Sequence, residues 1–150
     1  MTPQDFIASI SPAAKASAEV TKIPASFTVA QAALESAWGA HCPGYYNLFG
    51  IKADPSWKEP VTSQITNEVV NGKTITITAK FRAYPDWLGS INDHAQFLLT
   101  NKRYQPAFAY TTGALFAQAV AAAGYATDPL YAQKIVSIIK KHGLSALDMA

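Results

Sequence analysis

The segment at residues 30–39 constrains the fold more strongly than any other part of the chain, because it is dense in alanine and ends at a glycine. Such a composition favours a helix against which other elements pack closely. One apolar face at helical spacing consists of Phe27, Ala30, Leu34, Ala37 and Trp38. We therefore expect a central buried helix that stops at Gly39, since glycine readily terminates helices.

One carboxylate, Glu35, lies in the last turn of this predicted helix and shares a polar stripe with Thr28 and Gln31. Apolar neighbours and the negative end of the helix dipole both favour the protonated form of a carboxyl group at such a position. A protonated carboxyl group can give its proton to a leaving group, which makes Glu35 a candidate general acid. Composition alone leaves open an ordinary solvated glutamate at the edge of an amphipathic helix.

The region at about residues 60–82 is the clear β segment of the chain, with strands expected at 61–70 and 73–81. Between them stands Asn71-Gly72, a strong hairpin signal because both turn positions take a positive φ. Threonine and isoleucine alternate on the second strand, as a strand requires. Glu68 is therefore expected near the tip of an antiparallel hairpin, where the residues by themselves favour a solvated carboxylate.

Helical signals fill the rest of the chain. Pro12 is expected to break the first helical segment into two pieces, with Ser11 as the second N-cap. Asp128 is expected to cap the last helix, with Pro129 in its first turn. The helices after the hairpin are expected at about 86–101, 106–110, 113–124 and 129–142. The predicted class is α+β: mainly helical, with one β-hairpin lobe.

Length and composition fit one compact domain spanning residues 1–150. Apolar residues make up 49% of the 150 and charged residues 15%, as in globular proteins. The net charge of +2 excludes a strong nucleic-acid footprint without repelling a polyanionic partner. No apolar run is long enough for membrane insertion. The N-terminus lacks the pattern of a secretory signal, so we expect synthesis in the cytoplasm without one.

Other catalytic chemistries find little support in the sequence. His41 and Cys42 are adjacent, and adjacent side chains rarely point at each other as a nucleophile and its base must. The histidines, including His94 and His142, are far apart and lack paired acids, so no metal site is expected. No glycine-rich phosphate loop is present. We interpret His94 as a hydrogen-bonded structural histidine.

Four strings resemble, in order, the glucosaminidase family of peptidoglycan hydrolases, which includes the flagellar muramidase-type domain and many autolysins. They are residues 31–39 (QAALESAWG), 47–52 (NLFGIK), 78–84 (TAKFRAY) and 125–131 (YATDPLY), with Asp93-His94 before the last. The likeness spans nearly the whole chain. Ala37 departs from the family pattern, which more often has a second glycine there.

The resemblance implies a lysozyme-like fold and hydrolysis of glycan strands at the β-1,4 bond on the reducing side of N-acetylglucosamine, without a cofactor. Glu35 would protonate the leaving oxygen, and Glu68 would activate water or stabilise the oxocarbenium-like charge. Tyr125 would orient the N-acetyl group or the water. Weaker candidates for the second carboxylate are Glu59, Asp54 and Asp128.

The loop at residues 41–57 is expected to supply the sugar groove, because its aromatic side chains are costly to expose unless they pack or bind something. Phe49 and the neighbouring tyrosines could instead belong to the core. The expected substrate-binding residues are Gln31, Tyr46, Asn47, Phe49 and Trp57.

Three alternatives remain for the activity. A lytic transglycosylase would use Glu35 alone and let the sugar's 6-hydroxyl attack, a muramidase would cut the other glycosidic bond, and a wall-binding module would have lost turnover. The lack of both a signal and wall-anchoring repeats favours a phage or prophage endolysin. It would be a monomer that acts on the cell wall, in the periplasm or outside the cell, with glycan strands as its partner.

Overall fold

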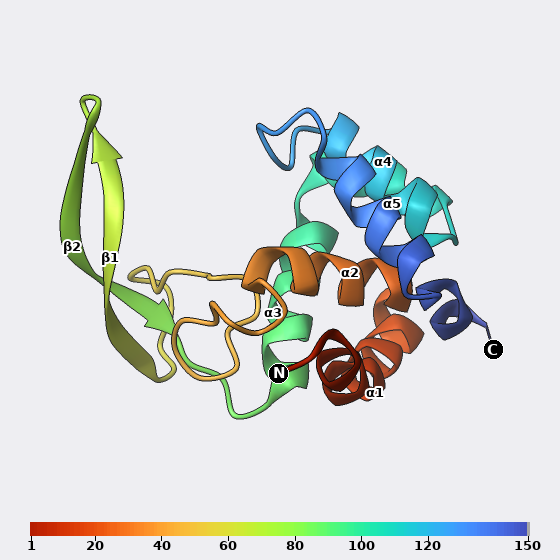
Figure 1. Ribbon diagram of the computed structural model, residues 1–150, viewed down its shortest axis with the longest axis horizontal. Helices are drawn as coiled ribbons and strands as arrows, with labels where there is room; N and C mark the ends of the chain where they lie inside the picture. Colours follow the sequence, from red (N-terminus) through yellow and green to blue (C-terminus); the bar gives the residue numbers. More distant parts are fainter. Residues whose placement is uncertain (150) are drawn as a thin grey trace.

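The structure, a computed structural model, describes residues 1–149 and shows a helical body from which a two-stranded hairpin extends (Figure 1). The predicted α+β class is confirmed. The elements are α1 (Pro3–Thr21), α2 (Ala25–Ser36), β1 (Val61–Val70), β2 (Lys73–Arg82), α3 (Trp87–Thr100), the 3-10 helix η1 (Lys102–Ala109), α4 (Gly113–Ala122), α5 (Tyr131–Lys141) and the 3-10 helix η2 (Leu144–Asp148). No helix within residues 1–149 has the length and apolarity needed to cross a lipid bilayer.

The predicted central helix is α2, and residues 25–33 are buried on every side of it. α1, α4, α5 and η2 all pack against it. The approach of α4 is especially close: a Cβ added to Gly113 would lie 2.1 Å from Oγ of Ser26. Only a glycine fits at this contact, because the van der Waals radii of the two atoms would overlap deeply.

α2 ends at Ser36, earlier than the stop predicted at Gly39. The hydroxyl of Ser36 donates to the carbonyl of Ala32 (2.6 Å) and accepts from the backbone N–H of Gly39 (3.0 Å). Ala37 and Trp38 already have positive φ values of 50° and 59°. The serine side chain thus turns the chain before the glycine is reached, and Glu35 stays in the last helical turn.

The expected break at Pro12 is wrong, because α1 continues unbroken through it. Proline inside a helix costs about 3 kcal/mol through the lost hydrogen bond and the ring clash. Phe6, Ile10 and Ala14 lie on both sides of Pro12 and are completely buried. Burial of one large apolar side chain contributes about 1.5–3 kcal/mol, so packing along the whole face outweighs the local cost.

The hairpin has the predicted turn. Asn71 and Gly72 have φ values of 52° and 76°, and the strands pair in register from Val61↔Arg82 to Val70↔Lys73. Residues 51–53 run along β2 near its root through a bridge between Lys52 and Phe81. The lobe is therefore held at its root, whereas no residue of β1 is fully buried.

Two expected helix starts differ in the structure. Pro106 lies inside η1 instead of opening a helix. Asp128 precedes α5, whose N-cap is Leu130, and accepts from the Leu130 backbone N–H (2.9 Å) and from Lys134 (2.6 Å). The Asp128 carboxylate therefore stabilises the turn at Pro129 and Leu130 that leads into α5, and it does not cap the helix itself.

The start of α2 is capped by a residue far along the chain, Asp148. Its carboxylate accepts from the backbone N–H of Ser26 (2.9 Å) and from the Ser26 hydroxyl (2.5 Å). Pro24 occupies the N-cap position and makes no side-chain cap bond. A remote carboxylate thus satisfies one of the free N–H groups at the positive end of this helix.

We expect Asp148→Ala to lower the free energy of unfolding by about 0.5–2 kcal/mol, the usual cost of losing a helix cap. Urea denaturation measures this change. Asp148→Asn keeps an acceptor oxygen and should recover most of the loss, and Asp5→Ala on α1 serves as the control for removing an exposed aspartate. An alanine variant as stable as the wild type would contradict the cap.

Candidate active site

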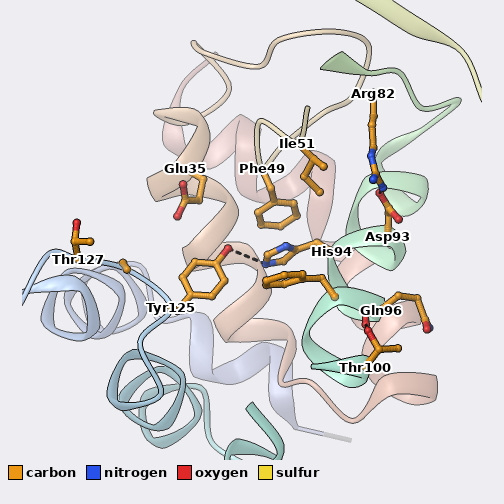
Figure 2. A pocket seen from close by; sticks show the side chains of 12 residues that line it. Glu35, Phe49, Ile51, Arg82, Asp93, His94, Gln96, Thr100, Tyr125 and Thr127 are labelled. Atoms are coloured by element: carbon orange, nitrogen blue, oxygen red, sulfur yellow. Dashed lines mark hydrogen bonds and ion pairs between the residues drawn. The ribbon is translucent and has the colours of Figure 1, made fainter. Parts of the chain in front are cut away.

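A pocket of about 680 Å³ opens beside the C-terminal end of α2. This volume lies within the range of small-molecule and sugar sites. Its walls come from the end of α2, the loop before the hairpin, the end of β2, one face of α3 and the α4–α5 connection (Figure 2). The lining residues are Glu35, Phe49, Ile51, Arg82, Asp93, His94, Gln96, Phe97, Thr100, Tyr125, Ala126 and Thr127.

Glu35 is exposed at this pocket, on the last turn of α2 (Figure 2). Its Oε1 accepts a hydrogen bond of 2.8 Å from the hydroxyl of Tyr131 on α5. The other carboxyl oxygen has no hydrogen-bond partner among residues 1–149. One oxygen is therefore fixed by the protein, and the second is available to a molecule in the pocket.

A chain of buried polar groups lies behind the acid. The side-chain amide of Gln31, fully buried, donates from Nε2 to Oη of Tyr131 (2.9 Å). Its Oε1 is 2.9 Å from Nε2 of His94, which is also 3.2 Å from Oη of Tyr125. Burial lowers the pKa of His94 to about 4, so its ring is neutral near pH 7.

Tyr125 lines the pocket beside the acid and stacks against Tyr131, with 5.5 Å between ring centroids. Burial, followed by the charge of Glu35, raises the pKa of the Tyr125 hydroxyl far above its ordinary value. Burial does the same for Tyr131. Both hydroxyl groups therefore keep their protons throughout the physiological range and serve as hydrogen-bond donors.

Of the five predicted substrate-binding residues, Phe49 lines the pocket, where its ring stacks on His94 at 4.0 Å. Gln31 and Asn47 are instead completely buried. The Asn47 amide donates to the carbonyls of Ile51 and Arg82, both at 2.9 Å, and accepts from the Ile51 N–H. Its bonds fold the loop onto the hairpin root and leave the side chain no surface for a sugar.

The two remaining aromatics lie outside the lining of the pocket. Tyr46 packs edge-on against Trp87 and is partly exposed. Trp57 packs against Tyr84, lies under the Arg82 guanidinium (4.6 Å to the ring centroid) and donates from its indole to the carbonyl of Pro60 (2.9 Å). In this structure Trp57 packs at the root of the hairpin and stabilises it.

Glu68 is not among the pocket-lining residues. It lies on the hairpin opposite Ile75 and forms an ion pair with Lys52, in which the two side chains are 37% and 54% exposed. The weaker candidates for the second carboxylate are bonded to other side chains or are exposed to solvent. Asp54 bonds to Ser56 and Arg82, and Glu59 is exposed.

The second carboxylate on the pocket is Asp93, which sequence reasoning did not single out. Its Oδ2 accepts from Arg82 (2.8 Å) and from the Tyr84 hydroxyl (2.5 Å). Asp93 thus links α3 to the hairpin root, and the positive charge of Arg82 balances its negative charge. Phe97, nearly half exposed on the pocket wall, was missed as well. For Asp93, the available signal was the family resemblance, because the Asp93-His94 pair and the string ending at Tyr84 both belong to the resembling strings.

Residues 1–149 contain no group of three His, Cys, Asp or Glu side chains placed to hold a metal ion. Cys42 is half-buried, and burial raises the pKa of its thiol. A raised pKa disfavours the thiolate that nucleophilic catalysis uses. Two carboxylates thus line the pocket: Asp93 is paired with Arg82, and Glu35 has the hydroxyl of Tyr131 as its partner.

Comparison with protein families matches residues 11–144 to the glucosaminidase family, described as mannosyl-glycoprotein endo-beta-N-acetylglucosaminidase. The peptidoglycan hydrolase FlgJ of Salmonella typhimurium is 40% identical over 144 residues, covering 92% of this chain and 46% of the relative. The exo-glucosaminidase LytG of Bacillus subtilis is 39% identical over 152 residues, covering 97% and 53%. The chain thus spans about half the length of these curated relatives.

Solved structures show the same fold. The glycoside hydrolase domain of Salmonella typhimurium FlgJ superposes with a TM-score of 0.85 at 37% identity, covering 97% of this chain and 91% of that one. The catalytic domain of the autolysin Auto from Listeria monocytogenes gives a TM-score of 0.84 at 31% identity, covering 97% and 86%. These domains confirm the expected lysozyme-like fold.

Proposed function

This chain belongs to the glucosaminidase family, and from that premise we propose that it hydrolyses the glycan strands of bacterial peptidoglycan. The bond cut is the β-1,4 link on the reducing side of N-acetylglucosamine. The observation that carries the proposal is the position of Glu35, which lines the pocket and has one oxygen held by Tyr131. A general acid on the pocket wall can come within hydrogen-bond reach of a leaving oxygen bound there.

The reaction proceeds as Glu35 transfers its proton to the glycosidic oxygen, so that the leaving sugar departs as an alcohol, while positive charge develops at the anomeric carbon of the N-acetylglucosamine on the other side of the breaking bond. The carboxylate that forms is stabilised by the O–H of Tyr131. Tyr125 lies beside Glu35 and presents a hydroxyl group to the pocket. Its role in the proposal is to orient the N-acetyl group or the attacking water.

We assign Glu68 as the second carboxylate, which approaches when substrate draws the hairpin over the pocket. Two observations support this assignment: the lobe is anchored at its root, and the ion pair that holds Glu68 is exposed. Exposed ion pairs contribute about 0–1 kcal/mol. Breaking the bond to Lys52 therefore costs little compared with the binding energy of a sugar chain.

A lytic transglycosylase is the second candidate. Glu35 is the carboxylate on the pocket without a cationic partner, since Asp93 is bonded to Arg82 and Glu68 lies elsewhere. An enzyme with one working carboxylate can use the sugar's own 6-hydroxyl as the nucleophile. Its product would then be an anhydro sugar.

Mass spectrometry of digested wall distinguishes the candidates. Hydrolysis as proposed gives fragments with reducing N-acetylglucosamine ends, and a muramidase gives reducing N-acetylmuramic acid. A transglycosylase gives products lighter by one water. Intact strands that remain bound to the protein would show a wall-binding module and overturn the proposal.

We further propose that residues 1–150 form one catalytic domain that works as a monomer. Support comes from α2, which four other helical elements cover, and from the residues 51–53 that join the hairpin to the body. Size-exclusion chromatography with light scattering tests the oligomeric state. A stable dimer would contradict this part of the proposal.

Phe97→Ala is expected to raise KM for soluble glycan fragments by roughly 2–10-fold, the loss of about 0.5–1.5 kcal/mol of ring stacking. kcat should change less, since the Phe97 ring has no group that can donate or accept the transferred proton. Leu99→Ala, on another face of α3 and similarly exposed, is the matched control. Equal KM values for the two variants would exclude Phe97 from the sugar site.

A further inference from the structure

The buried amide of Gln31 links two groups whose proton positions depend on each other. One end contacts the Tyr131 hydroxyl and the other contacts Nε2 of His94, each at 2.9 Å. The ring of His94 is neutral, because burial lowers its pKa to about 4. A neutral imidazole carries one N–H, so Nε2 either donates to Gln31 or accepts from it.

The two possibilities have opposite consequences at the acid. If Nε2 of His94 donates, the Gln31 oxygen accepts, its N–H group donates to Tyr131, and the Tyr131 O–H points at Glu35. If Nε2 accepts, the amide is reversed and the Tyr131 O–H points back at Gln31. Tyr131 can then only accept from Glu35, which would tie up the proton that catalysis transfers.

We propose that His94 and Gln31 are positioning residues, which act through Tyr131 to keep one oxygen of Glu35 as a hydrogen-bond acceptor and the other as the proton carrier. This inference rests on the proposed function, with Glu35 as the general acid. It gives Gln31 a role behind the site instead of a contact with sugar. Neither Gln31 nor Tyr131 lines the pocket.

We call the hydrogen-bonded chain of His94, Gln31 and Tyr131 the relay. It also accounts for the hydroxyl of Tyr125, which lies 3.2 Å from the same Nε2. With the hydrogen on Nε2 directed at Gln31 and Tyr125 together, the hydroxyl hydrogen of Tyr125 remains for a partner in the pocket. One histidine tautomer thus orders both tyrosines that flank the acid (Figure 2 shows His94 and Tyr125).

The relay should be visible in kcat and not in KM. Tyr131 contacts the acid, and neither Tyr131 nor Gln31 lines the pocket in which the sugar would lie. Substitution of Gln31 by methionine or of Tyr131 by phenylalanine changes no charge on the pocket wall, where Glu35 is accompanied by Tyr125, His94 and the Arg82–Asp93 ion pair. A fall in kcat at constant KM therefore reports the loss of the Tyr131 hydrogen bond.

The test is a double-mutant cycle with Gln31→Met and Tyr131→Phe, measured on soluble glycan fragments. Each single variant should lower kcat roughly tenfold, as expected for a hydrogen bond to a charged group, and should leave KM within twofold. The double variant should match Tyr131→Phe alone, since Gln31 acts through the tyrosine.

His94 provides the conservative comparison. His94→Phe keeps the stack on Phe49 but has no donor, and should lower kcat as Gln31→Met does. His94→Gln supplies an amide N–H and should recover part of the loss. Gln133→Met, exposed on α5, and Tyr110→Phe, partly exposed after η1, are the matched controls. Thermal melting of each variant identifies any that fold poorly.

Two outcomes would overturn the relay: additive losses in the cycle, or a rise in KM with constant kcat. Glu35→Gln in the same assay separates this inference from the proposed function. An inactive Glu35→Gln with an additive cycle rejects the relay alone. An active Glu35→Gln rejects the acid on which the relay depends.

Discussion

Replacement of Glu35 by glutamine is expected to reduce glycan hydrolysis by about 10²–10⁴-fold or more, the usual contribution of a general acid. Glutamine keeps the shape of the side chain and can still accept from Tyr131, but it has no carboxyl proton to transfer. Release of soluble fragments from purified wall measures the loss.

The controls separate chemistry from folding. Glu35 is exposed and its hydrogen bond to Tyr131 can be kept by the amide oxygen, so Glu35→Gln should melt close to the wild type and still sediment with wall. Glu19→Gln, an exposed glutamate on α1 far from the pocket, should retain full activity. Activity of Glu35→Gln within a few-fold of wild type would sink the assignment of the acid.

Replacement of Glu68 by glutamine is expected to have the second-largest effect, a loss of kcat on the order of 10²-fold. The loss should be smaller than for Glu35, because the N-acetyl group or Tyr125 can partly replace a base for water. In this structure Glu68 is paired with Lys52 and does not line the pocket, so the expected loss depends on the hairpin closing over the substrate. A two-stranded lobe is marginally stable by itself and can move as a unit.

Purified glycan strands and both glutamine variants decide this point. Lys52→Met removes the partner of Glu68 and should change kcat far less than Glu68→Gln, since it frees the carboxylate. Glu59→Gln tests the neighbouring exposed glutamate. Full activity in Glu68→Gln would falsify its catalytic role and leave Glu35 with a water held by other groups, or with the transglycosylase route.

Local rules were sufficient for much of the fold. Asn71-Gly72 specified its turn because few dipeptides accept positive φ at two successive positions, and the alanine-rich run specified the central helix. Local rules failed at Pro12 and Gly39. At Pro12, the packing of α1 keeps the helix intact. At the end of α2, the hydroxyl of Ser36 turns the chain before Gly39 is reached.

From the sequence alone came the α+β class, the family resemblance and the prediction that Glu35 is the acid, because helical spacing puts Glu35 in the last turn of a buried helix. Which groups meet Glu35 depends on the tertiary structure. Tyr131 is 96 residues away from Glu35, and Gln31 is 63 away from His94. No periodicity reaches over such separations, because helical spacing describes neighbours on one element. The partners of the acid follow from how α2, α3 and α5 pack, and this packing is set by the whole core.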